Sequence, residues 1–167
     1  MVHNLIRTTK PIPLINSTSF YFEVKIIDGG KNDYLGIGIT EADPNTRSGS
    51  FPGWDTFPTL GIGYHGDDGK IFHKNGYTKS DFVEKFTTGD VVGCLIYLAR
   101  TKDNEINLVQ FTKNGKKLNF PRVVKTKVWY PTIGISSPGA SVDTNFGQHP
   151  FLYLREGNYI EEIVLFH

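Results

Sequence analysis

Residues 51–76 read FPGWDTFPTLGIGYHGDDGKIFHKNG, and this stretch decides the fold class. The DDG at 67–69 separates two runs that carry apolar residues, and its glycine supplies the positive φ angle that closes a tight hairpin. Trp54 and Tyr64 are large aromatic residues close to that turn. The stretch therefore predicts a loop, a strand, a turn and a second strand, which form either a rigid corner or one wall of a recognition site.

The composition favours one soluble β domain. A chain of 167 residues is long enough to bury its own core. Hydrophobic residues make up 38% and charged residues 21%, which is typical of a globular domain and excludes a disordered one. The 18 glycines and 9 prolines, together with 13% aromatic residues, favour many short strands joined by tight turns.

Charge and cysteine usage restrict the partners and the compartment. The net charge of +1 provides no basic field for a phosphate backbone, so we expect no nucleic-acid partner. No run approaches the ~20 apolar residues of a membrane span, and residues 1–16 hold no signal-peptide core. We therefore expect no membrane partner. One cysteine cannot form an internal disulfide, which predicts a cytoplasmic or nuclear protein. We also expect the isolated domain to be monomeric.

Apolar patterning predicts a succession of strands with turns about 8–12 residues apart, as in a β-sandwich. Glycines inside the second run, Gly36 and Gly38, indicate a close approach of another backbone or a bend. The KNGK at 113–116 is a strong two-residue hairpin signal. The expected strands cover 20–26, 34–40, 91–98, 106–112, 128–135 and 141–146.

The remaining segments are less regular. We expect 1–19 to be an extended lead-in at the edge of the sandwich, 20–152 to be the sandwich itself, and 153–167 to be an extension that packs on the domain or leaves it. Residues 75–85 are expected to form a polar loop. Residues 161–166 fit a short helix or a last strand equally well.

No set of residues predicts an enzyme, a cofactor or a metal. Cys94 stands inside the apolar run VVGCLIYL, so it is expected to be a buried core residue with a raised pKa. His65 and His73 flank two aspartates, but their spacing is not that of a zinc or calcium motif. The aspartates at 67–68 are better explained as turn formers.

Two residues allow both a structural and a functional interpretation. Trp54, stiffened by prolines on both sides, is expected to be a structural plug at the sandwich edge; the alternative is an exposed interface anchor. Arg7 precedes Pro11 on an extended segment that can lie across strand ends. A single arginine is usually a solvated surface charge.

Seven segments, taken in order, resemble a SPRY domain: FYFEVKI, LGIGIT, PGWD, GYHGDDGKIF, FTTGDVVGCLI, FTKNGK and YPTIGISSPGASVDTNFGQHPF. The resemblance runs from about residue 7 to 151, and it looks closest to the Ran-binding protein M branch of the family. It implies a bent β-sandwich of two antiparallel sheets, of the concanavalin-like jelly-roll type. It also implies a non-enzymatic protein-interaction module that binds a short peptide or a partner domain, as a scaffold or ubiquitin-ligase substrate adaptor.

The same resemblance implies a shallow pocket made by loops at one edge of the sandwich. Trp54, Gly89, Asp90 and Cys94 fall on its structural positions. The loop after residue 74 departs from the usual glycine-rich sequence of the family. The residues that the resemblance places at the pocket are Arg7, Thr9, Tyr64, His65, Ser136, Ser137 and Pro138.

Two alternatives come from other classes of protein. A carbohydrate-binding or small-ligand-binding, lectin-like sandwich would use the aromatic loop with Asp67, Asp68 and Asn75. An enzyme would have its best candidate group at His65, Asp67 and His73.

Overall fold

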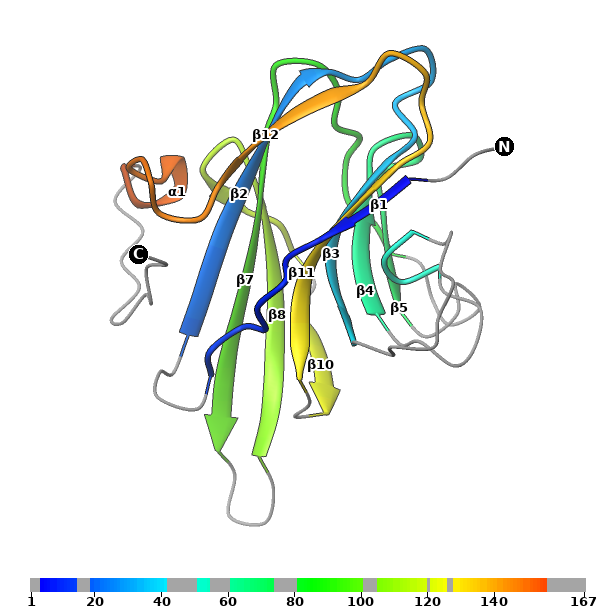
Figure 1. Cartoon of the computed structure of the whole chain (residues 1–167). Coiled ribbons are helices and arrows are strands. Elements are labelled where there is room, and N and C mark those ends of the chain that lie inside the picture. The colour runs from blue at the N-terminus through cyan, green and yellow to red at the C-terminus, as the bar shows by residue number, and fades with distance from the viewer. Residues whose placement is uncertain are drawn as a thin grey trace. The chain divides into compact units, whose positions relative to one another are not determined.

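The computed structural model describes residues 4–14, 19–41, 51–54, 61–73, 81–100, 105–119, 121–125 and 128–155, and they are almost entirely β structure (Figure 1). In chain order the elements of these ranges are β1 (Asn4–Arg7), β2 (Ser19–Asp28), β3 (Leu35–Glu41), β4 (Gly61–His65), β5 (Lys70–His73), β6 (Asp81–Phe82), β7 (Val91–Arg100), β8 (Glu105–Lys113), β9 (Lys116–Lys117), β10 (Arg122–Lys125), β11 (Trp129–Ile135), β12 (Ser141–Asn145) and α1 (Leu152–Arg155).

One antiparallel sheet has the strand order β1-β11-β3-β4-β5-β6. Paired residues point to the same face of a sheet, and successive residues along a strand point to opposite faces. One row of paired residues defines what we call the Tyr64 face, and it holds Ile6, Ile133, Ile37, Tyr64 and Ile71. The next row along the strands points to the opposite face, which we call the Arg7 face, and it carries Arg7, Thr132 and Phe72.

The other antiparallel sheet has the order β10-β8-β7-β2-β12, and β9 also pairs with β8. Strands β7 and β8 form its longest ladder, which runs from Val92 opposite Lys113 to Arg100 opposite Glu105. Residues 92–96 of β7 are buried without interruption, as the continuous apolar run predicted. Figure 1 shows β7 and β8 as neighbouring long arrows.

The chain divides into two compact units. The first contains the sheet that begins with β1, and the second contains nearly all of the sheet that begins with β10. The first unit comprises Met1–Ile12, Ile27–Gly89 and Val128–Ser141, and the second comprises Pro13–Ile26, Asp90–Lys127 and Val142–His167.

A buried carboxylate anchors α1 in the second unit. Glu23 is 4% exposed and accepts hydrogen bonds from the backbone N–H groups of Leu152 and Tyr153, each at 3.0 Å. It also accepts the hydroxyl proton of Tyr21 at 2.9 Å, and that hydroxyl lies 2.8 Å from Thr112 Oγ1. Burial, followed by the charge of Glu23, raises the pKa of Tyr21 far above its usual value. The arrangement satisfies a carboxylate that would otherwise be costly to bury.

The structure confirms the fold class: the described chain is all-β with two antiparallel sheets and only one short helix. All six predicted strands are present, with ends that differ by a few residues. The hairpin at 113–116 is confirmed, because Asn114 and Gly115 both have the positive φ angles of a type I′ turn (49° and 78°). The lead-in contains strand β1, which was expected only to be extended. The residues 161–166 lie outside the described part.

Candidate functional site

Strand β1 places Arg7 at an open edge of the first sheet. Its guanidinium carbon lies 5.1 Å from the centre of the Tyr130 ring, which is a cation–π contact. The backbone N–H of Thr8 continues the β1–β11 pairing with a 3.2 Å bond to the Pro131 carbonyl. Arg7 and Thr9 are both exposed, whereas Tyr130 is half-buried. Tyr130 thus supports a cation that solvent and a partner can both reach.

The segment 51–54 (FPGW) lies across the Arg7 face over glycines. A Cβ atom added at Gly134 would stand 2.0 Å from the Phe51 ring. One added at Gly63 would stand 2.2 Å from the carbonyl oxygen of Pro52. Real Cβ atoms do not approach other atoms this closely, so glycine is required at both positions. The interior glycines of β3 follow the same rule, since a Cβ at Gly38 would stand 1.9 Å from the Ile62 carbonyl oxygen. The predicted close approach of backbones is confirmed.

Trp54 ends this segment as an exposed aromatic. Its side chain is 53% exposed, and its ring meets the Phe72 ring edge-on with centres 4.9 Å apart. The backbone N–H of Trp54 donates to the Phe51 carbonyl at 3.0 Å across a turn in which Gly53 has a φ of 78°. The expectation that Trp54 is a structural plug is therefore met only in part: the ring packs on Phe72, but about half of the residue is exposed.

His65 lies beneath the FPGW segment and is 5% exposed. Its ring packs between the rings of Phe72 and Phe51, with centres 4.4 Å and 5.3 Å away. Its Nε2 atom is 2.9 Å from the Pro52 carbonyl oxygen, which can only accept, so Nε2 carries a proton and donates. Burial lowers the pKa of His65, while the Pro52 hydrogen bond and the charge of Asp68 oppose the shift. The neutral His65 side chain therefore holds the FPGW segment in place through its contacts with Pro52 and Phe51.

Tyr64 points to the other face and is fully buried. Its ring meets the Phe86 ring edge-on, with centres 4.8 Å apart. Its hydroxyl donates to the backbone carbonyl of Glu84. The side chain therefore ties β4 to the segment after β6, and it contacts no solvent.

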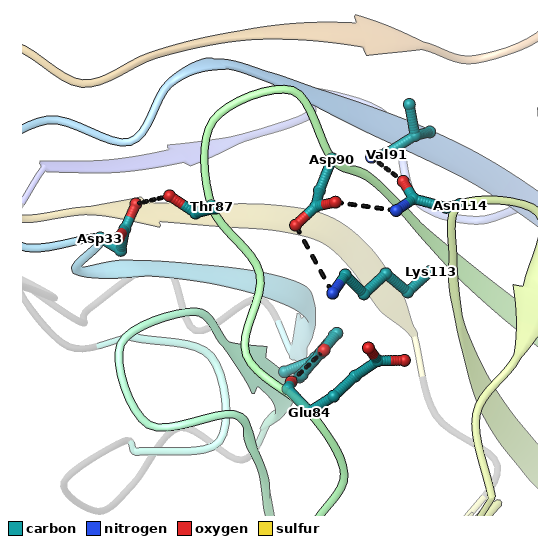
Figure 2. Close-up of polar contacts among 8 residues, drawn as sticks. Asp33, Glu84, Thr87, Asp90, Val91, Lys113 and Asn114 are labelled. Atoms are coloured by element: carbon teal, nitrogen blue, oxygen red, sulfur yellow. Dashed lines mark hydrogen bonds and ion pairs between the residues drawn. The ribbon is translucent and has the colours of Figure 1, made fainter.

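Three loops of the first unit are joined by hydrogen bonds, and we call residues 29–34, 87–88 and 136–140 the three-loop cluster. Ser137 Oγ accepts the Asn32 N–H at 2.9 Å, and the Pro138 carbonyl accepts the Lys31 N–H at 3.3 Å. The Thr87 hydroxyl donates to Asp33 at 2.8 Å (Figure 2). Ser136 and Ser137 are buried, whereas Pro138 and Gly139 are exposed at the tip.

The structure brings the seven pocket residues together only in part. Arg7 and His65 share one face, while Tyr64 points to the opposite face. Arg7 pairs with Thr132, so it stands about 13 Å along the strands from the level of Ser136. The exposed members are Arg7, Thr9 and Pro138, and the buried members are Tyr64, His65, Ser136 and Ser137.

Tyr130 is the surface residue that sequence reasoning missed, whereas for Trp54 it gave exposure only as the alternative to a structural plug. The sequence WYP around Tyr130 reads as an ordinary strand, and nothing local indicates that Arg7 will lie over the ring. For Trp54 a signal was present, because a tryptophan in a proline-rich and glycine-rich loop is typical of interface anchors. Position in the sequence alone did not distinguish its exposed edge from its packed edge.

The described residues give little support to the alternatives to protein binding, which are a catalytic site and a ligand site. Cys94 is fully buried, which confirms the expected core position, and burial raises the pKa of its thiol strongly. Among the described residues, no cluster of three or more His, Cys, Asp or Glu side chains is arranged to hold a metal ion. Asp68 accepts the Lys70 N–H within the turn, as expected of a turn former, and Asn75 lies outside the described residues. No described helix has the length and apolar character needed to cross a membrane.

Comparison with known proteins gives consistent matches. The sequence profile of the SPRY domain matches residues 19–149. Ran-binding protein 9 of Danio rerio is 42% identical over 148 residues, which cover 89% of this chain and 23% of that protein. The same protein of Xenopus laevis is 42% identical over 94% of this chain and 26% of its own length, and the Ran-binding protein M homolog of Arabidopsis thaliana is 31% identical over 89% of this chain and 29% of its own. The chain thus spans about a quarter of these relatives.

Solved structures agree with the sequence matches. A human SPRY domain superposes with a TM-score of 0.67 and 26% identity, over 89% of this chain and 87% of that one. The SPRY domain of human HERC1 superposes with a TM-score of 0.59 over 90% of this chain and 86% of that one. Its 15% identity supports the fold alone.

Proposed function

This chain belongs to the SPRY domain family, and we propose that it recognises a short extended peptide of a partner protein through the exposed loops and edge of its first unit. SPRY domains are generally non-enzymatic modules that bind protein partners. The finer proposal is that this chain serves as a scaffold or as a substrate adaptor of a ubiquitin ligase. Arg7, Thr9 and Pro138 would contact the peptide.

The single observation that carries the proposal is the exposed guanidinium of Arg7 above the Tyr130 ring. The ring restricts the side chain before a partner arrives, so less conformational entropy is lost when the guanidinium pairs with a carboxylate. An arginine also presents a fork of donors that matches a carboxylate in two bonds. We therefore propose that the peptide carries an acidic residue opposite Arg7.

The spacing of the exposed residues suits an extended peptide. Arg7 and the tip of the three-loop cluster are separated by about 13–20 Å along the strands, which an extended peptide of about six residues spans. Trp54 lies over β5 on the Arg7 face, which makes it a second anchor for a longer partner. Tryptophan and arginine are enriched among the residues that dominate binding energy.

The buried members of the predicted pocket take a supporting role in this proposal. Ser137 joins two loops of the three-loop cluster, and His65 holds the FPGW segment. Rigid loops lower the entropy cost of binding. We further propose that the domain is monomeric and works in the cytoplasm or nucleus, where a single buried thiol such as Cys94 remains reduced.

A display selection tests the proposal. A library of random twelve-residue peptides is selected on the full chain, and the enriched peptides are measured against Arg7→Ala and against the control Lys25→Ala, which removes an exposed cation from β2. We expect a shared motif with an acidic residue, and binding that weakens about tenfold in Arg7→Ala and is unchanged in Lys25→Ala. Peptides that bind all three proteins equally would place the recognition surface elsewhere.

A further inference from the structure

Strand β10 is the edge of the second sheet, in the part of the chain that the structure describes. It pairs on one side only, with β8, in the register Arg122–Val109, Val123–Leu108 and Val124–Asn107. An unpaired edge strand carries a row of free backbone donors and acceptors, which can pair with a strand of another chain. The neighbouring pairs of β8 reveal which groups of β10 point to this open side.

Backbone hydrogen bonds alternate in direction along β8. The N–H of Leu118 donates to the Phe111 carbonyl at 3.0 Å, so the odd-numbered residues of β8 bond toward β9 and β10. The N–H of Asn114 donates to the Val91 carbonyl at 2.7 Å, so the even-numbered residues bond toward β7. The backbone groups of Val109 therefore form hydrogen bonds with those of Arg122, and the backbone groups of Asn107 with those of Val124. The N–H and C=O groups of Val123 and Lys125 consequently point away from β8, to the open edge.

The side chain beside these groups is apolar and exposed. Val123 is 55% exposed, and its row continues through Leu108 on β8 to Tyr97 on β7, both of which are half-buried. The row forms a shallow apolar strip that ends at the open edge of the sheet. A strand added to β10 would extend this strip and cover Val123.

The charge along the same edge is positive. Residues 113–125 (KNGKKLNFPRVVK) contain five cationic residues and no acidic one, although the whole chain has a net charge of only +1. Lys113 is neutralised within the fold, since its Nζ lies 3.6 Å from the Asp90 carboxylate, which also accepts from Asn114 at 2.8 Å (Figure 2). Lys116 and Lys117 of β9 are exposed, and β9 pairs with β8 on the β10 side.

These features favour an acidic partner strand over the other occupants of an edge. A second copy of RVVK, paired antiparallel through the outward groups of Val123, would bring together two strands whose charged residues are all cationic, and repulsion between like charges across a sheet is destabilising. A nucleic acid or a lipid surface would use the charge but would leave the backbone groups of Val123 without partners. An extended acidic segment satisfies the backbone, the apolar strip and the charge together.

We propose that the β10 edge is a second interaction surface, which binds an extended acidic segment of a partner protein by strand addition. Val123 and Lys125 provide the backbone pairing, Val123 provides the apolar contact, and the exposed lysines of β9, Lys116 and Lys117, select acidic side chains. This surface lies in the second unit and is independent of the proposed site around Arg7.

A short alternating glutamate–valine peptide, carbon-13 labelled at its central carbonyl, tests the proposal on the full chain. The matched probe replaces glutamate with lysine. We expect the acidic peptide to bind, its labelled carbonyl to shift to the infrared frequency of a β-sheet, and exchange of the Val123 amide to slow. We expect Val123→Pro to weaken binding about tenfold or more, because it removes an outward N–H at an edge position that tolerates proline. Val123→Asp, which adds a repelling charge at an exposed position, should weaken it similarly.

Charge variants separate strand addition from simple attraction. Lys116→Glu should weaken binding about threefold, while Lys25→Glu, the same change on β2 of the same sheet, should leave it unchanged. The proposal is overturned if the wild-type chain ignores the acidic peptide or binds the lysine peptide equally well. It is also overturned if folded Val123→Pro and Val123→Asp both bind as the wild type does. An anionic vesicle or oligonucleotide that binds regardless of Val123→Pro and displaces the peptide would show a phosphate surface instead.

Discussion

At the scale of single residues, the first unit contains exposed side chains that a partner can reach and buried side chains that hold them in place. Trp54 and Tyr64 provide the sharpest contrast, because both are aromatic and only ten residues apart. Trp54→Ala removes an exposed ring that packs on Phe72, and it should cost about 1 kcal/mol of unfolding free energy. Tyr64→Ala empties a fully buried site and should cost about 4 kcal/mol. Chemical denaturation measures both values, and similar costs for the two variants would contradict the assignment.

His65 gives the fold a dependence on pH. Its pKa is lowered in the folded state by burial, so the unfolded chain binds the proton more readily. Stability from neutral His65 is fully present above the ordinary histidine pKa of about 6.5 and declines as the pH falls below it. We therefore expect the unfolding free energy to fall between pH 7.5 and 5.5, and to fall less in His65→Gln. Asp67, whose pKa is raised chiefly by burial, acts in the opposite sense and at lower pH. An equal decline in both proteins would refute the role of His65.

The resemblance to the SPRY family predicted the seven pocket residues as a set, but the sequence did not predict which of the seven are buried. In GIGYH, glycines occupy the positions beside Tyr64 that would have revealed an alternating pattern, so the face to which Tyr64 points was not evident. The two interpretations of Trp54 both contained part of the answer, because one edge of the ring packs and the other is exposed. Local rules succeeded for Cys94, where a continuous apolar run leaves only a buried position.

At the scale of elements, the FPGW segment depends on the glycines beneath it. Gly63→Ala would place a Cβ 2.2 Å from the Pro52 carbonyl oxygen, so the segment must move. We expect a loss of about 2 kcal/mol, together with a change in acrylamide quenching of Trp54 fluorescence. Trp129 contributes little to quenching because it is 3% exposed. Gly139→Ala is the control: its φ of 83° costs about 1 kcal/mol, but nothing lies near the added Cβ, so Trp54 quenching should not change.

Helix α1 depends on Glu23 in a similar way. Glu23→Ala removes the acceptor of the Leu152 and Tyr153 N–H groups and of the Tyr21 hydroxyl. We expect a loss of about 3 kcal/mol and faster hydrogen exchange at residues 152–153. Glu23→Gln, which keeps one acceptor oxygen, should lose less. Unchanged exchange in Glu23→Ala would show that α1 is held by its apolar packing alone.

Elements were predictable where their signals are local. The turn at 113–116 follows from the φ requirements of Asn-Gly, and the longer strands follow from apolar patterning. Strand β1 was predicted only as extended chain, because its identity comes from pairing with β11, more than 120 residues away in the sequence. Strand β10 escaped prediction because RVVK is short and carries charge at both ends, which is how natural edge strands limit unwanted pairing.

At the scale of the whole molecule, we propose that the chain combines a SPRY fold with two separate interaction surfaces, one in each unit. The relatives that it matches are about four times as long, so the partners of those proteins are not limited to partners of the part that this chain matches. The Arg7 surface offers one supported cation and an aromatic anchor, whereas the β10 edge offers backbone pairing and several cations.

The most direct test of the central claim is the footprint of a selected peptide, measured by hydrogen–deuterium exchange on the full chain. If the loops and edge of the first unit are the recognition surface, peptide binding should slow exchange in residues 4–9, 51–54 and 136–140 and leave β7 and β8 unchanged. The Arg7→Ala protein should show no such protection at the same peptide concentration. Protection confined to the second unit, or protection that persists in Arg7→Ala, would contradict the account.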